Sequence, residues 1–375
     1  MKKLHITFVD FDDIKNPFLS GGQARATFEV SRRLVKMGHK VTIICSRYPK
    51  SKDQKYYGIF YKHIGLGSAN IRFNNAAFFV ALPLALWKFK ADVIIECFTA
   101  PISTCFSPLY TKIPVIGMPT MFEAGEFSKK YHLPFHLVEK LGVRFYKYFL
   151  AYSPINQKKM LKMNPKIHFR LIPNGIGEEA FTKKVKDGNY ALFIGRIDIV
   201  QKGLDLLLEA FARINGKVST KLVIAGNGPK DEEKRLVGLI KKKKLEGKVR
   251  FVGRADGKKK ELLLRGAKFG VYPSRFEDFP LVPLEYTSFS KPVVCFDVAG
   301  MKWVTDDVSL KARPFRVDEL SQKLIEISTN SKLRLKLSKS ARPFARKYGW
   351  NNISRDYANF CREVVDLDKR ERQRL

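Results

Sequence analysis

The chain has 375 residues, and its 70 lysine and arginine residues against 36 acidic ones give a formal net charge of +34. With 45% hydrophobic residues it is too apolar to be disordered, and it is long enough for two domains. Basic residues occur throughout both halves, which excludes a folded core with a detachable basic tail. A field of this sign attracts phosphates, so the candidate partners are nucleic acid, an anionic membrane and phosphorylated small molecules.

The first residues run directly into an alternating strand pattern, with no apolar stretch long enough for a signal peptide, so we expect a cytoplasmic protein. The longest apolar run, residues 76–87, contains Pro83 and is shorter than the ~20 residues of a membrane span. It predicts a core helix, or at most an interfacial one. The five cysteines lack CxxC spacing and are predicted to be reduced, buried thiols, neither zinc ligands nor disulfides. The histidines show no metal-binding spacing, and no metal site is predicted.

Short runs rich in valine, isoleucine and phenylalanine alternate with stretches of helical periodicity, which indicates βα units and parallel sheets. In the first half, a helix is predicted over residues 23–37, and the predicted strands are 4–9, 41–45, 59–64, 92–96 and 114–118. The pattern restarts in the second half. There the predicted strands are 191–194, 222–225, 249–252, 269–272 and 293–296, with helices near 203–214, 230–244, 258–266 and 317–328.

The predicted fold is therefore α/β, with two doubly wound, Rossmann-like domains that face one another across a cleft. The N-terminal domain takes residues 1–168 and the C-terminal domain takes 169–340, because Pro173, Asn174 and Gly175 interrupt the pattern near this point. Residues 341–375 have apolar side chains at helical spacing, and we expect this segment to pack back on the N-terminal domain. Ligands of doubly wound sheets bind at the carboxyl ends of the strands, so residues of both domains would share one ligand.

Two glycine-containing turns are candidate phosphate sites. Gly21 and Gly22 lie between the first strand and the first helix, where free amides and the helix dipole favour an anion, although an ordinary flexible turn explains them equally well. In the second half, Arg196 ends a strand and Lys202 begins a helix. At one strand-to-helix corner both can reach a diphosphate, whereas most other basic residues are expected to be solvated.

Glu277 and Glu285 form a third candidate. Two intervening prolines forbid a continuous helix, which places Glu277 in the loop after strand 269–272 and Glu285 in the next helix. The amides of Leu281 and Val282 then lie at a helix N-terminus and can hold a phosphate, while an acid on the loop can bind sugar or ribose hydroxyls. Two surface carboxylates are the ordinary alternative, but this stretch of apolar residues and prolines is a poor candidate for a solvated face.

Taken together, these segments resemble the GT-B-type glycosyltransferases, in particular the large retaining family four with its many mannosyl- and glucosyltransferases of glycan and glycolipid assembly. The resemblance extends over nearly the whole chain and is most detailed from residue 172 to 300. The matching segments, in order, are Ser20-Gly21-Gly22, Ile172-Pro173-Asn174-Gly175-Ile176, Gly195-Arg196-Ile197-Asp198, Lys202-Gly203-Leu204-Asp205, Ala225-Gly226-Asn227-Gly228-Pro229, Phe251-Val252-Gly253, Glu277 with Glu285, and Lys291-Pro292-Val293-Val294.

The resemblance implies a role for each candidate residue. Arg196 and Lys202 would neutralise the nucleotide diphosphate, and Glu277 would contact the donor sugar; these three form the implied catalytic set. Gly22, with Gly21, would bring its loop onto the diphosphate, and Glu285 would bind the ribose. The Leu281 and Val282 amides would assist at the phosphate, and the backbone near Gly253 would lie by the nucleobase. The resemblance also implies a UDP- or GDP-linked hexose donor, retention of configuration and no obligatory metal or cofactor.

Three departures from the family pattern concern the sugar and acceptor side. The histidine common after the strand at 114–118 is missing from residues 118–123, and Glu123 or Glu126 are candidate substitutes. The glycine usual after the first acid is Asp278, and the usual glycine pair near 299–300 is Ala299-Gly300. The sequence therefore leaves the identity of the sugar and the geometry of the acceptor open.

We expect a hexosyltransferase that acts on an acceptor glycan or lipid, in the cytoplasm or peripherally on the inner face of the membrane. An anionic membrane partner is suggested by aromatic and basic residues mixed over 72–90 and 144–149, which amphipathic core helices with solvated lysines explain equally well. The alternatives are another nucleotide-sugar enzyme, such as an epimerase or phosphorylase, and a non-catalytic nucleic-acid-binding protein. No nucleic acid is expected as a partner, because no RRM, KH, zinc or helix-turn-helix signature is present.

Overall fold

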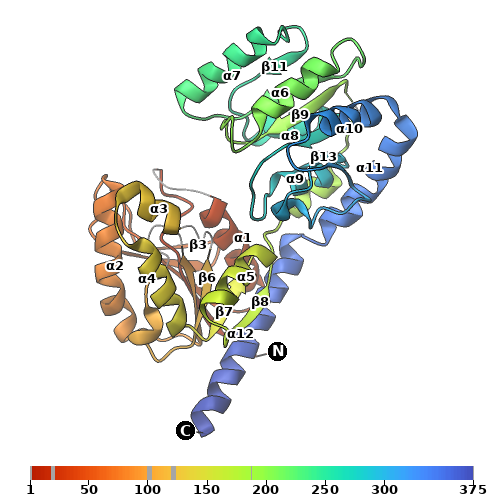
Figure 1. The fold of residues 1–375 in the computed structure, drawn as a ribbon. Coiled ribbons are helices and arrows are strands. Elements are labelled where there is room, and N and C mark those ends of the chain that lie inside the picture. Colours follow the sequence, from red (N-terminus) through yellow and green to blue (C-terminus); the bar gives the residue numbers. More distant parts are fainter. Residues whose placement is uncertain (1, 18–21, 99–103, 120–123, 187, 375) are drawn as a thin grey trace. The chain divides into compact units, whose positions relative to one another are not determined.

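The computed structural model describes residues 2–17, 22–98, 104–119, 124–186 and 188–374 (Figure 1). The chain divides into two compact units. Unit 1 comprises Met1–Asn174 and Trp350–Leu375, and unit 2 comprises Gly175–Gly349. The sequence-based boundaries lie at 168/169 and 340/341, a few residues before these positions.

Unit 1 is built on a sheet with the strand order β3-β4-β2-β1-β5-β6-β7-β8. Only β3 among the paired strands is antiparallel to its neighbour; the other described pairs are parallel. The strands are β1 (His5–Val9), β2 (Lys40–Ser46), β3 (Gln54–Tyr56), β4 (Ile59–Ile64), β5 (Val93–Phe98), β6 (Val115–Pro119), β7 (Tyr148–Ala151) and β8 (His168–Leu171).

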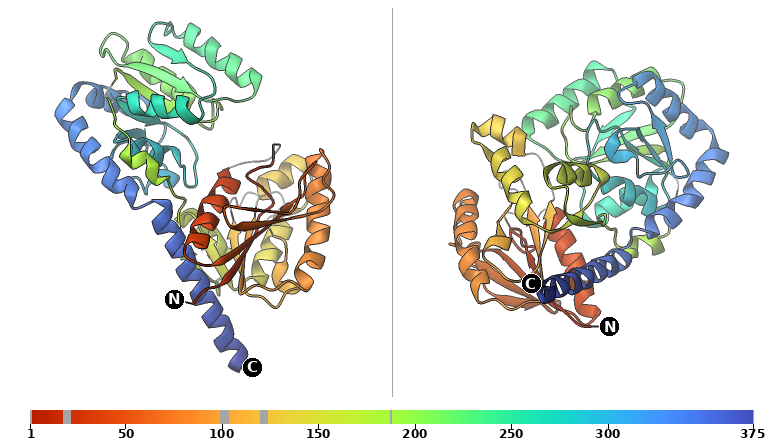
Figure 2. Two further views of the ribbon diagram at one scale, coloured as in Figure 1. Left: turned by 180° about the vertical axis from the view of Figure 1, so that it is seen from behind. Right: turned by 60° about the horizontal axis from the view of Figure 1, so that its bottom comes forward.

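The helices of unit 1 include one from the far end of the chain. α12 packs against α1, and Arg33 Nε donates to Asn351 Oδ1 at 2.8 Å; Figure 2 shows this dark blue helix running beside the red one. On β8, His168 Nε2 lies 2.7 Å from Glu363 Oε1 of the same helix. The α-helices are α1 (Gly22–Lys36), α2 (Ile71–Trp87), α3 (Ala124–Tyr131), α4 (Phe135–Gly142), α5 (Pro154–Met163) and α12 (Trp350–Arg374), with short 3-10 turns at Ser107–Leu109 and Val143–Phe145.

Unit 2 repeats the plan with a parallel sheet in the order β11-β10-β9-β12-β13-β14. Its strands are β9 (Tyr190–Ile194), β10 (Lys221–Ala225), β11 (Val249–Phe251), β12 (Phe269–Tyr272), β13 (Val293–Phe296) and β14 (Ser309–Ala312). Its α-helices are α6 (Leu204–Arg213), α7 (Lys230–Lys242), α8 (Gly257–Gly266), α9 (Val282–Ser288), α10 (Val317–Thr329) and α11 (Ser331–Arg346), with 3-10 turns at Glu178–Thr182 and Ala299–Met301.

Both sheets are doubly wound, with the first strand of each unit in the interior of its sheet. The central strands are buried along nearly their whole length, as expected where helices cover both faces. The strand order reverses between β1 and β5 in unit 1 and between β9 and β12 in unit 2. In such sheets the ligand crevice opens at this switch point, at the carboxyl ends of the strands.

The sequence-based strands are confirmed in place. β3, β7, β8 and β14 were not among the predicted strands; β3, β8 and β14 contain polar residues and are not rich in valine, isoleucine or phenylalanine. The apolar run at 76–87 lies in α2, which is not a fully buried core helix: Val80, Leu84 and Trp87 are 75–76% exposed. No helix among the described residues is long and apolar enough to span a membrane.

The cysteines are free thiols, which confirms that they form no disulfides. Cys45, Cys295 and Cys361 are buried as predicted, whereas Cys97 and Cys105 are partly exposed.

The packing of α12 yields a stability prediction. The Phe360 ring is 1% exposed and stacks on His168, with a 5.9 Å centroid separation. Replacing Phe360 with alanine removes this buried ring, so we expect unit 1 to lose about 3–5 kcal/mol of unfolding free energy. Hydrogen exchange should show the loss of protection in unit 1 strands and not in unit 2. Asn359→Ala, at the exposed neighbouring position, is the control; equal loss in the two variants would contradict the assignment.

Candidate functional site

The loops that follow β9 and β12 meet at the switch point of unit 2. We call residues 195–203 and 273–279 together the unit 2 corner. Gly203 joins the two loops: its φ is 65°, and a Cβ there would lie 2.0 Å from the carbonyl oxygen of Pro273. Ser274 Oγ lies 2.9 Å from the carbonyl oxygen of Gln201, and the amide of Arg275 donates to that oxygen at 2.9 Å. Only glycine permits this close approach, which fixes the start of α6 and the position of Lys202 in the turn just before it.

Lys202 and Glu277 form a largely buried ion pair in this corner. Lys202 Nζ contacts Glu277 Oε1 and lies 3.2 Å from the Tyr272 hydroxyl, and the two charged side chains are 11% and 12% exposed. Tyr272 and Ser274 donate to the same Oε1 at 2.9 and 2.7 Å. All the interactions described for Glu277 fall on Oε1, so Oε2 is the oxygen that a ligand hydroxyl can approach.

Tyr272 is held as a neutral donor. Burial raises the pKa of its phenol well above the usual range, and the charge of Glu277 raises it further. The hydroxyl therefore stays protonated and donates to the carboxylate throughout the physiological pH range. These hydrogen bonds fix the Glu277 carboxylate in place beside Lys202.

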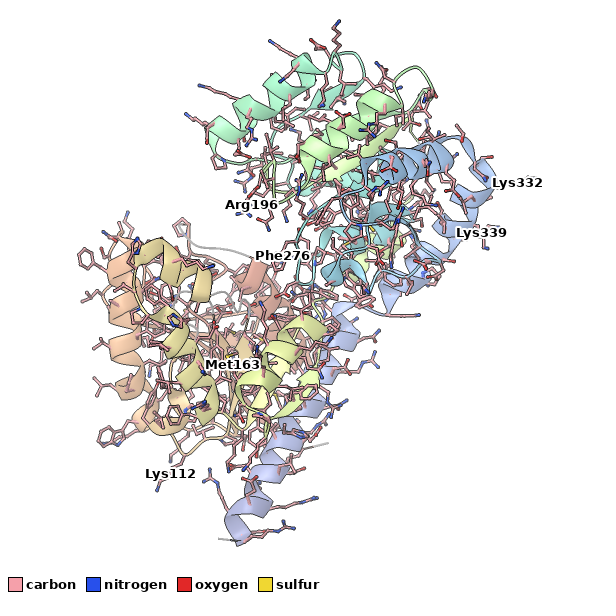
Figure 3. The ribbon with its side chains drawn as sticks, viewed as in Figure 1. Lys112, Met163, Arg196, Phe276, Lys332 and Lys339 are labelled. Atoms are coloured by element: carbon pink, nitrogen blue, oxygen red, sulfur yellow. The ribbon has the colours of Figure 1, made fainter. Side chains whose placement is uncertain are left out.

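Arg196 lies at the mouth of the same corner and is free to reorient. Its side chain is 59% exposed, bonds the side chain of Gln201 and lies 3.5 Å from Asp198 Oδ2. Exposed pairs of this kind contribute little to stability, so a bound anion can replace them at small cost. Figure 3 labels Arg196 and Phe276, which come from the two loops of the corner.

Arg275 and Asp205 stabilise the corner, and the sequence analysis did not identify them. Arg275 Nη1 and Nη2 each donate to one oxygen of Asp205 at 2.8 Å, and Nη1 also donates to the carbonyl of Val200 at 2.6 Å. Burial alone would raise the pKa of Asp205, but the hydrogen bonds and charge of Arg275 outweigh it and lower the pKa. The sequence analysis included Asp205 in the Lys202-Gly203-Leu204-Asp205 segment. It could not identify Arg275 as the partner of Asp205, because the two residues are 70 positions apart.

Glu285 lies on α9, in the helix whose start carries the Leu281 and Val282 amides. Lys260 of α8 donates to Glu285 Oε1 at 2.5 Å. The other oxygen, Oε2, is buried and has no hydrogen-bond partner among the described residues. Lys260, which the sequence analysis left among the basic residues expected to be solvated, is only 30% exposed and is ion-paired. An orphaned carboxylate oxygen is the feature expected where a ligand hydroxyl is to bind.

Glycines set the backbone around both acids. Gly226 leaves no room for a side chain, since a Cβ would lie 1.8 Å from the carbonyl oxygen of Gly195, and its amide donates to the carbonyl of Gly253 at 2.9 Å. Gly253 itself has a φ of 66° and open space beside it. A Cβ at Gly300 would lie 1.8 Å from the carbonyl oxygen of Glu277. Gly300 thus lets the loop that carries Glu277 lie against the turn at Ala299–Met301.

In unit 1 the predicted residues are only partly visible. Gly22 begins α1, whereas Gly21 lies outside the described residues. The structure adds a buried carboxylate that sequence reasoning missed: Asp10, directly after β1, accepts a hydrogen bond from Thr27 of α1 and lies 3.5 Å from Gln23 Nε2. Burial raises the pKa of Asp10.

The position of the missing histidine cannot be filled from the described residues. Met118 is buried in β6, where its sulfur accepts from the hydroxyls of Tyr152 and Tyr357 at 3.4 and 3.2 Å. Glu123 and the side chain of Glu126 lie outside the described residues.

Two family descriptions match adjoining parts of the chain. "Glycosyltransferase Family 4" matches residues 20–179, and "Glycosyl transferases group 1" matches residues 178–344.

The curated relatives are distant. An uncharacterized glycosyltransferase of Methanocaldococcus jannaschii is 28% identical over 59% of this chain and 64% of its own length. The phosphatidyl-myo-inositol mannosyltransferase of Mycobacterium tuberculosis is 25% identical over 49% of this chain and 51% of its own. The gpi3 subunit of the phosphatidylinositol N-acetylglucosaminyltransferase of Schizosaccharomyces pombe is 24% identical over 92% of this chain and 78% of its own length. The first relatives are matched over only 46–64% of their lengths.

Solved structures share the fold. The sucrose-phosphate synthase of Thermosynechococcus elongatus superposes with a TM-score of 0.80 at 19% identity, covering 97% of this chain and 100% of that one. Anabaena HepE, solved in complex with UDP and glucose, gives a TM-score of 0.72 at 15% identity, with 95% and 99% coverage. At these identities the likeness establishes the fold alone.

The close approach at Gly300 can be tested directly. In Gly300→Ala the new methyl group collides with the backbone of Glu277, so we expect a loss of about 1–3 kcal/mol of unfolding free energy and a displaced Glu277. The control is Gly238→Ala in α7, where no atom lies within 4 Å of the new Cβ. Alanine there should stabilise the helix by about 0.5–1 kcal/mol. Urea unfolding measures the free energy of unfolding of both variants. If Gly300→Ala left this free energy unchanged, the contact between Gly300 and Glu277 would be contradicted.

Proposed function

The chain belongs to glycosyltransferase family 4 and has the GT-B fold, and from this premise we propose that it transfers a hexose from a nucleotide-diphosphate sugar to an acceptor. The observation that carries the proposal is the unit 2 corner. There Lys202 and Glu277 are paired in near-complete burial beside the exposed Arg196, at the switch point where doubly wound sheets bind ligands.

The donor diphosphate is assigned to Arg196 and Lys202. Arg196 presents a planar fork of donors that it can turn toward the ligand, and Lys202 supplies a fixed point charge. The Leu281 and Val282 amides would add two donors at the start of α9. Gly22 and Gly21 would contribute backbone from unit 1. UDP and GDP are the proposed nucleotides, and UDP is bound in the structure of Anabaena HepE.

The ribose and the sugar are assigned to the two acids. Glu285 Oε2 is buried without a partner, and a ribose hydroxyl would satisfy it. The backbone near Gly253, with open space beside it, would accommodate the nucleobase. Glu277 Oε2 would accept from a hydroxyl of the donor sugar, while its other oxygen is held by Lys202, Tyr272 and Ser274.

In the proposed reaction, the bond between the anomeric carbon and the diphosphate oxygen breaks and the acceptor oxygen forms the new bond with retention. Negative charge builds on the leaving diphosphate, and the acceptor's hydroxyl proton passes to it. Lys202 stabilises that charge from a position fixed before the reaction, and Arg196 turns onto the diphosphate when the donor binds. Because two protein cations already face the phosphates, we propose that transfer requires no metal.

We propose that the acceptor is a glycan or a lipid and that the protein acts at the inner face of an anionic membrane. Phe73, Val80, Leu84 and Trp87 of α2 are 64–76% exposed, and their spacing places them on one side of the helix. Lys88 and Lys90 follow directly and can reach anionic headgroups.

The other aromatic and basic stretch does not form part of this surface. In residues 144–149, Tyr146, Tyr148 and Phe149 are buried in the core of unit 1. The burial of these three rings favours the alternative interpretation of packing in the core, whereas Phe145 of the same stretch is 45% exposed.

The donor assignment predicts a selective effect of Arg196→Ala. Losing one charged donor at the diphosphate should lower kcat/KM about 100- to 1,000-fold without loss of stability, since Arg196 is exposed. Arg235→Ala is the matched control, because Arg235 is 55% exposed and paired with Glu232. Nucleoside diphosphate released from UDP- or GDP-hexose in the presence of acceptor is the readout. Similar rates in the two variants would refute the site, and release without any acceptor would favour another class of nucleotide-sugar enzyme.

The membrane assignment predicts that Leu84→Glu with Trp87→Glu abolishes flotation with vesicles of anionic lipid at low salt. The control is Leu335→Glu in unit 2, where the leucine is 58% exposed on α11. If the wild-type protein does not float, or the double variant floats equally well, α2 is not a membrane-docking surface.

A further inference from the structure

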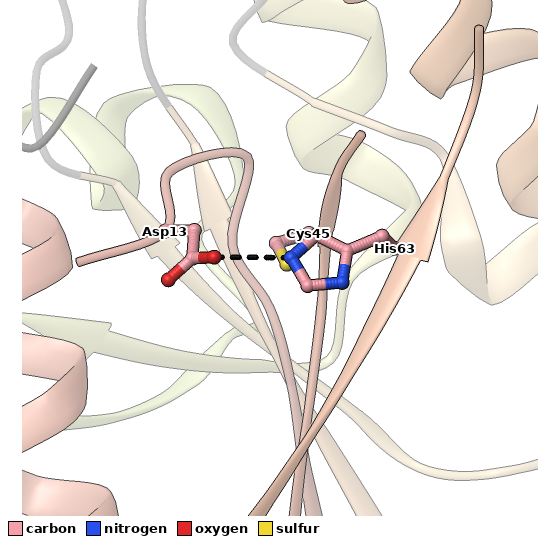
Figure 4. A group of neighbouring side chains, drawn as sticks. All are labelled: Asp13, Cys45 and His63. Atoms are coloured by element: carbon pink, nitrogen blue, oxygen red, sulfur yellow. Dashed lines mark hydrogen bonds and ion pairs between the residues drawn. The ribbon is translucent and has the colours of Figure 1, made fainter. Parts of the chain in front are cut away.

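A mixed cluster of an acid, a thiol and an imidazole lies in unit 1, on residues that the proposed transfer does not use. Asp13 follows β1, Cys45 lies in β2 and His63 lies in β4. Cys45 and His63 are direct partners in the parallel register of β2 and β4, so their side chains leave the same face of the sheet. Figure 4 shows the three side chains converging, with the Asp13 carboxylate turned toward the His63 ring.

The ligand atoms are spaced as metal ligands are. One atom from each residue lies within 4.8 Å of the other two, and Asp13 Oδ2 is 3.0 Å from His63 Nε2. Tetrahedral zinc with bonds of about 2.0–2.3 Å holds its ligand atoms about 3.3–3.8 Å apart. The cluster therefore needs shifts of only about 1 Å to surround an ion.

Burial and hydrogen bonding leave the right atoms available. Asp13, Cys45 and His63 are 1%, 0% and 2% exposed. Asp13 Oδ1 accepts the amide of Lys15 at 2.9 Å, and Oδ2 is bonded to His63 Nε2. Tyr48 also hydrogen-bonds Asp13, and the Cys45 thiol lies 3.7 Å from the carbonyl of Lys62, so an ion would replace the contacts between the three ligand atoms.

His63 Nδ1 is buried without a hydrogen-bond partner and lies 3.6 Å from Asp53 Oδ1. Asp53 Oδ1 accepts the backbone amide of His63 at 2.8 Å, and a shift of under about 1 Å would let this carboxylate also accept from Nδ1. A carboxylate on the far nitrogen is the usual companion of a metal-bound histidine, because it fixes the ring and its tautomer.

The negative charge of the Asp13 and Asp53 carboxylates also favours a bound cation. The described ion pairs of Asp13 and Asp53 are both with His63. The nearest lysine in sequence, Lys15, is directed to Gln54 and to the ring of Tyr56. The chain has about twice as many basic as acidic residues. Even so, the buried Asp13 carboxylate forms no ion pair with a lysine or arginine among the described residues. Buried charges are normally paired or bound to a metal.

We propose that Asp13 Oδ2, Cys45 Sγ and His63 Nε2 bind one Zn²⁺ ion, with a water molecule as the fourth ligand and Asp53 orienting His63. The combination of thiolate, imidazole and carboxylate suits zinc and excludes Mg²⁺ and Ca²⁺, which take oxygen ligands. Binding releases the thiol proton of Cys45 to solvent. The ion joins the segment after β1 to β2 and β4, and it has a structural role separate from the unit 2 corner.

Sequence spacing could not reveal this site. Its three ligands come from three separate segments, and no segment contributes two ligands whose spacing could be recognised. The sequence interpretation of the cysteines as thiols without a metal role is revised here for Cys45 alone.

The test uses the full chain purified without chelator. Elemental analysis should give one zinc per chain, and replacement by Co²⁺ should produce the thiolate-to-cobalt charge-transfer band of a sulfur-bound ion. Cys45→Ser should lose that band, and Asp53→Asn should weaken zinc affinity about 10–100-fold. Cys361→Ser, which removes a buried thiol of the same unit outside the cluster, should change neither.

The rival is an ordinary ion pair between protonated His63 and Asp13. It predicts no zinc in the wild-type protein, no rise in melting temperature when Zn²⁺ is added to chelator-treated protein, and no charge-transfer band with Co²⁺; these results would overturn the proposal. Zinc retained by Cys45→Ser would also overturn it. Because the wild-type measurements decide between the two, the test does not depend on the variants folding.

Discussion

The Lys202–Glu277 ion pair is the interaction on which the arrangement of unit 2 depends. It joins the segment after β9 to the segment after β12, the two strands between which the sheet order reverses. Both charges are nearly buried, so neither is tolerable alone; removing one partner of such a pair typically costs about 3–5 kcal/mol. Tyr272 and Ser274 complete the carboxylate's hydrogen bonds on the same oxygen. The pair therefore fixes an acid and a cation at the place where a diphosphate and a sugar are proposed to meet.

The sequence predicted those parts of the site in which the backbone conformation needs a glycine or the ligand needs a charge. Short apolar runs that alternate with helical periodicity predicted the two α/β units, and the glycine-flanked Arg196 and Lys202 indicated an anion site. Partners distant in sequence could not be predicted: nothing in the local pattern links Arg275 to Asp205, or Lys260 to Glu285. These contacts exist only because parallel strands bring the ends of separate βα units to one edge.

In unit 1, the sequence likewise could not predict which charged and aromatic side chains are exposed and which are buried. Composition indicated anionic partners but could not separate an exposed apolar face on α2 from the buried rings of residues 146–149, since both are runs of aromatic and basic residues. It also could not show that Asp13, Cys45 and His63 meet on one face of a sheet. In both cases the deciding quantity was burial, which depends on packing between segments.

The most direct measurement of the central claim is calorimetric titration of nucleoside diphosphate and of the matching nucleotide-diphosphate sugar into Arg196→Ala and into the control Arg235→Ala. If Arg196 binds the diphosphate, Arg196→Ala weakens both ligands by about the same factor, whereas Arg235→Ala weakens neither. Unchanged affinity of Arg196→Ala for the nucleoside diphosphate, or an equal loss of affinity in Arg235→Ala, would contradict the account.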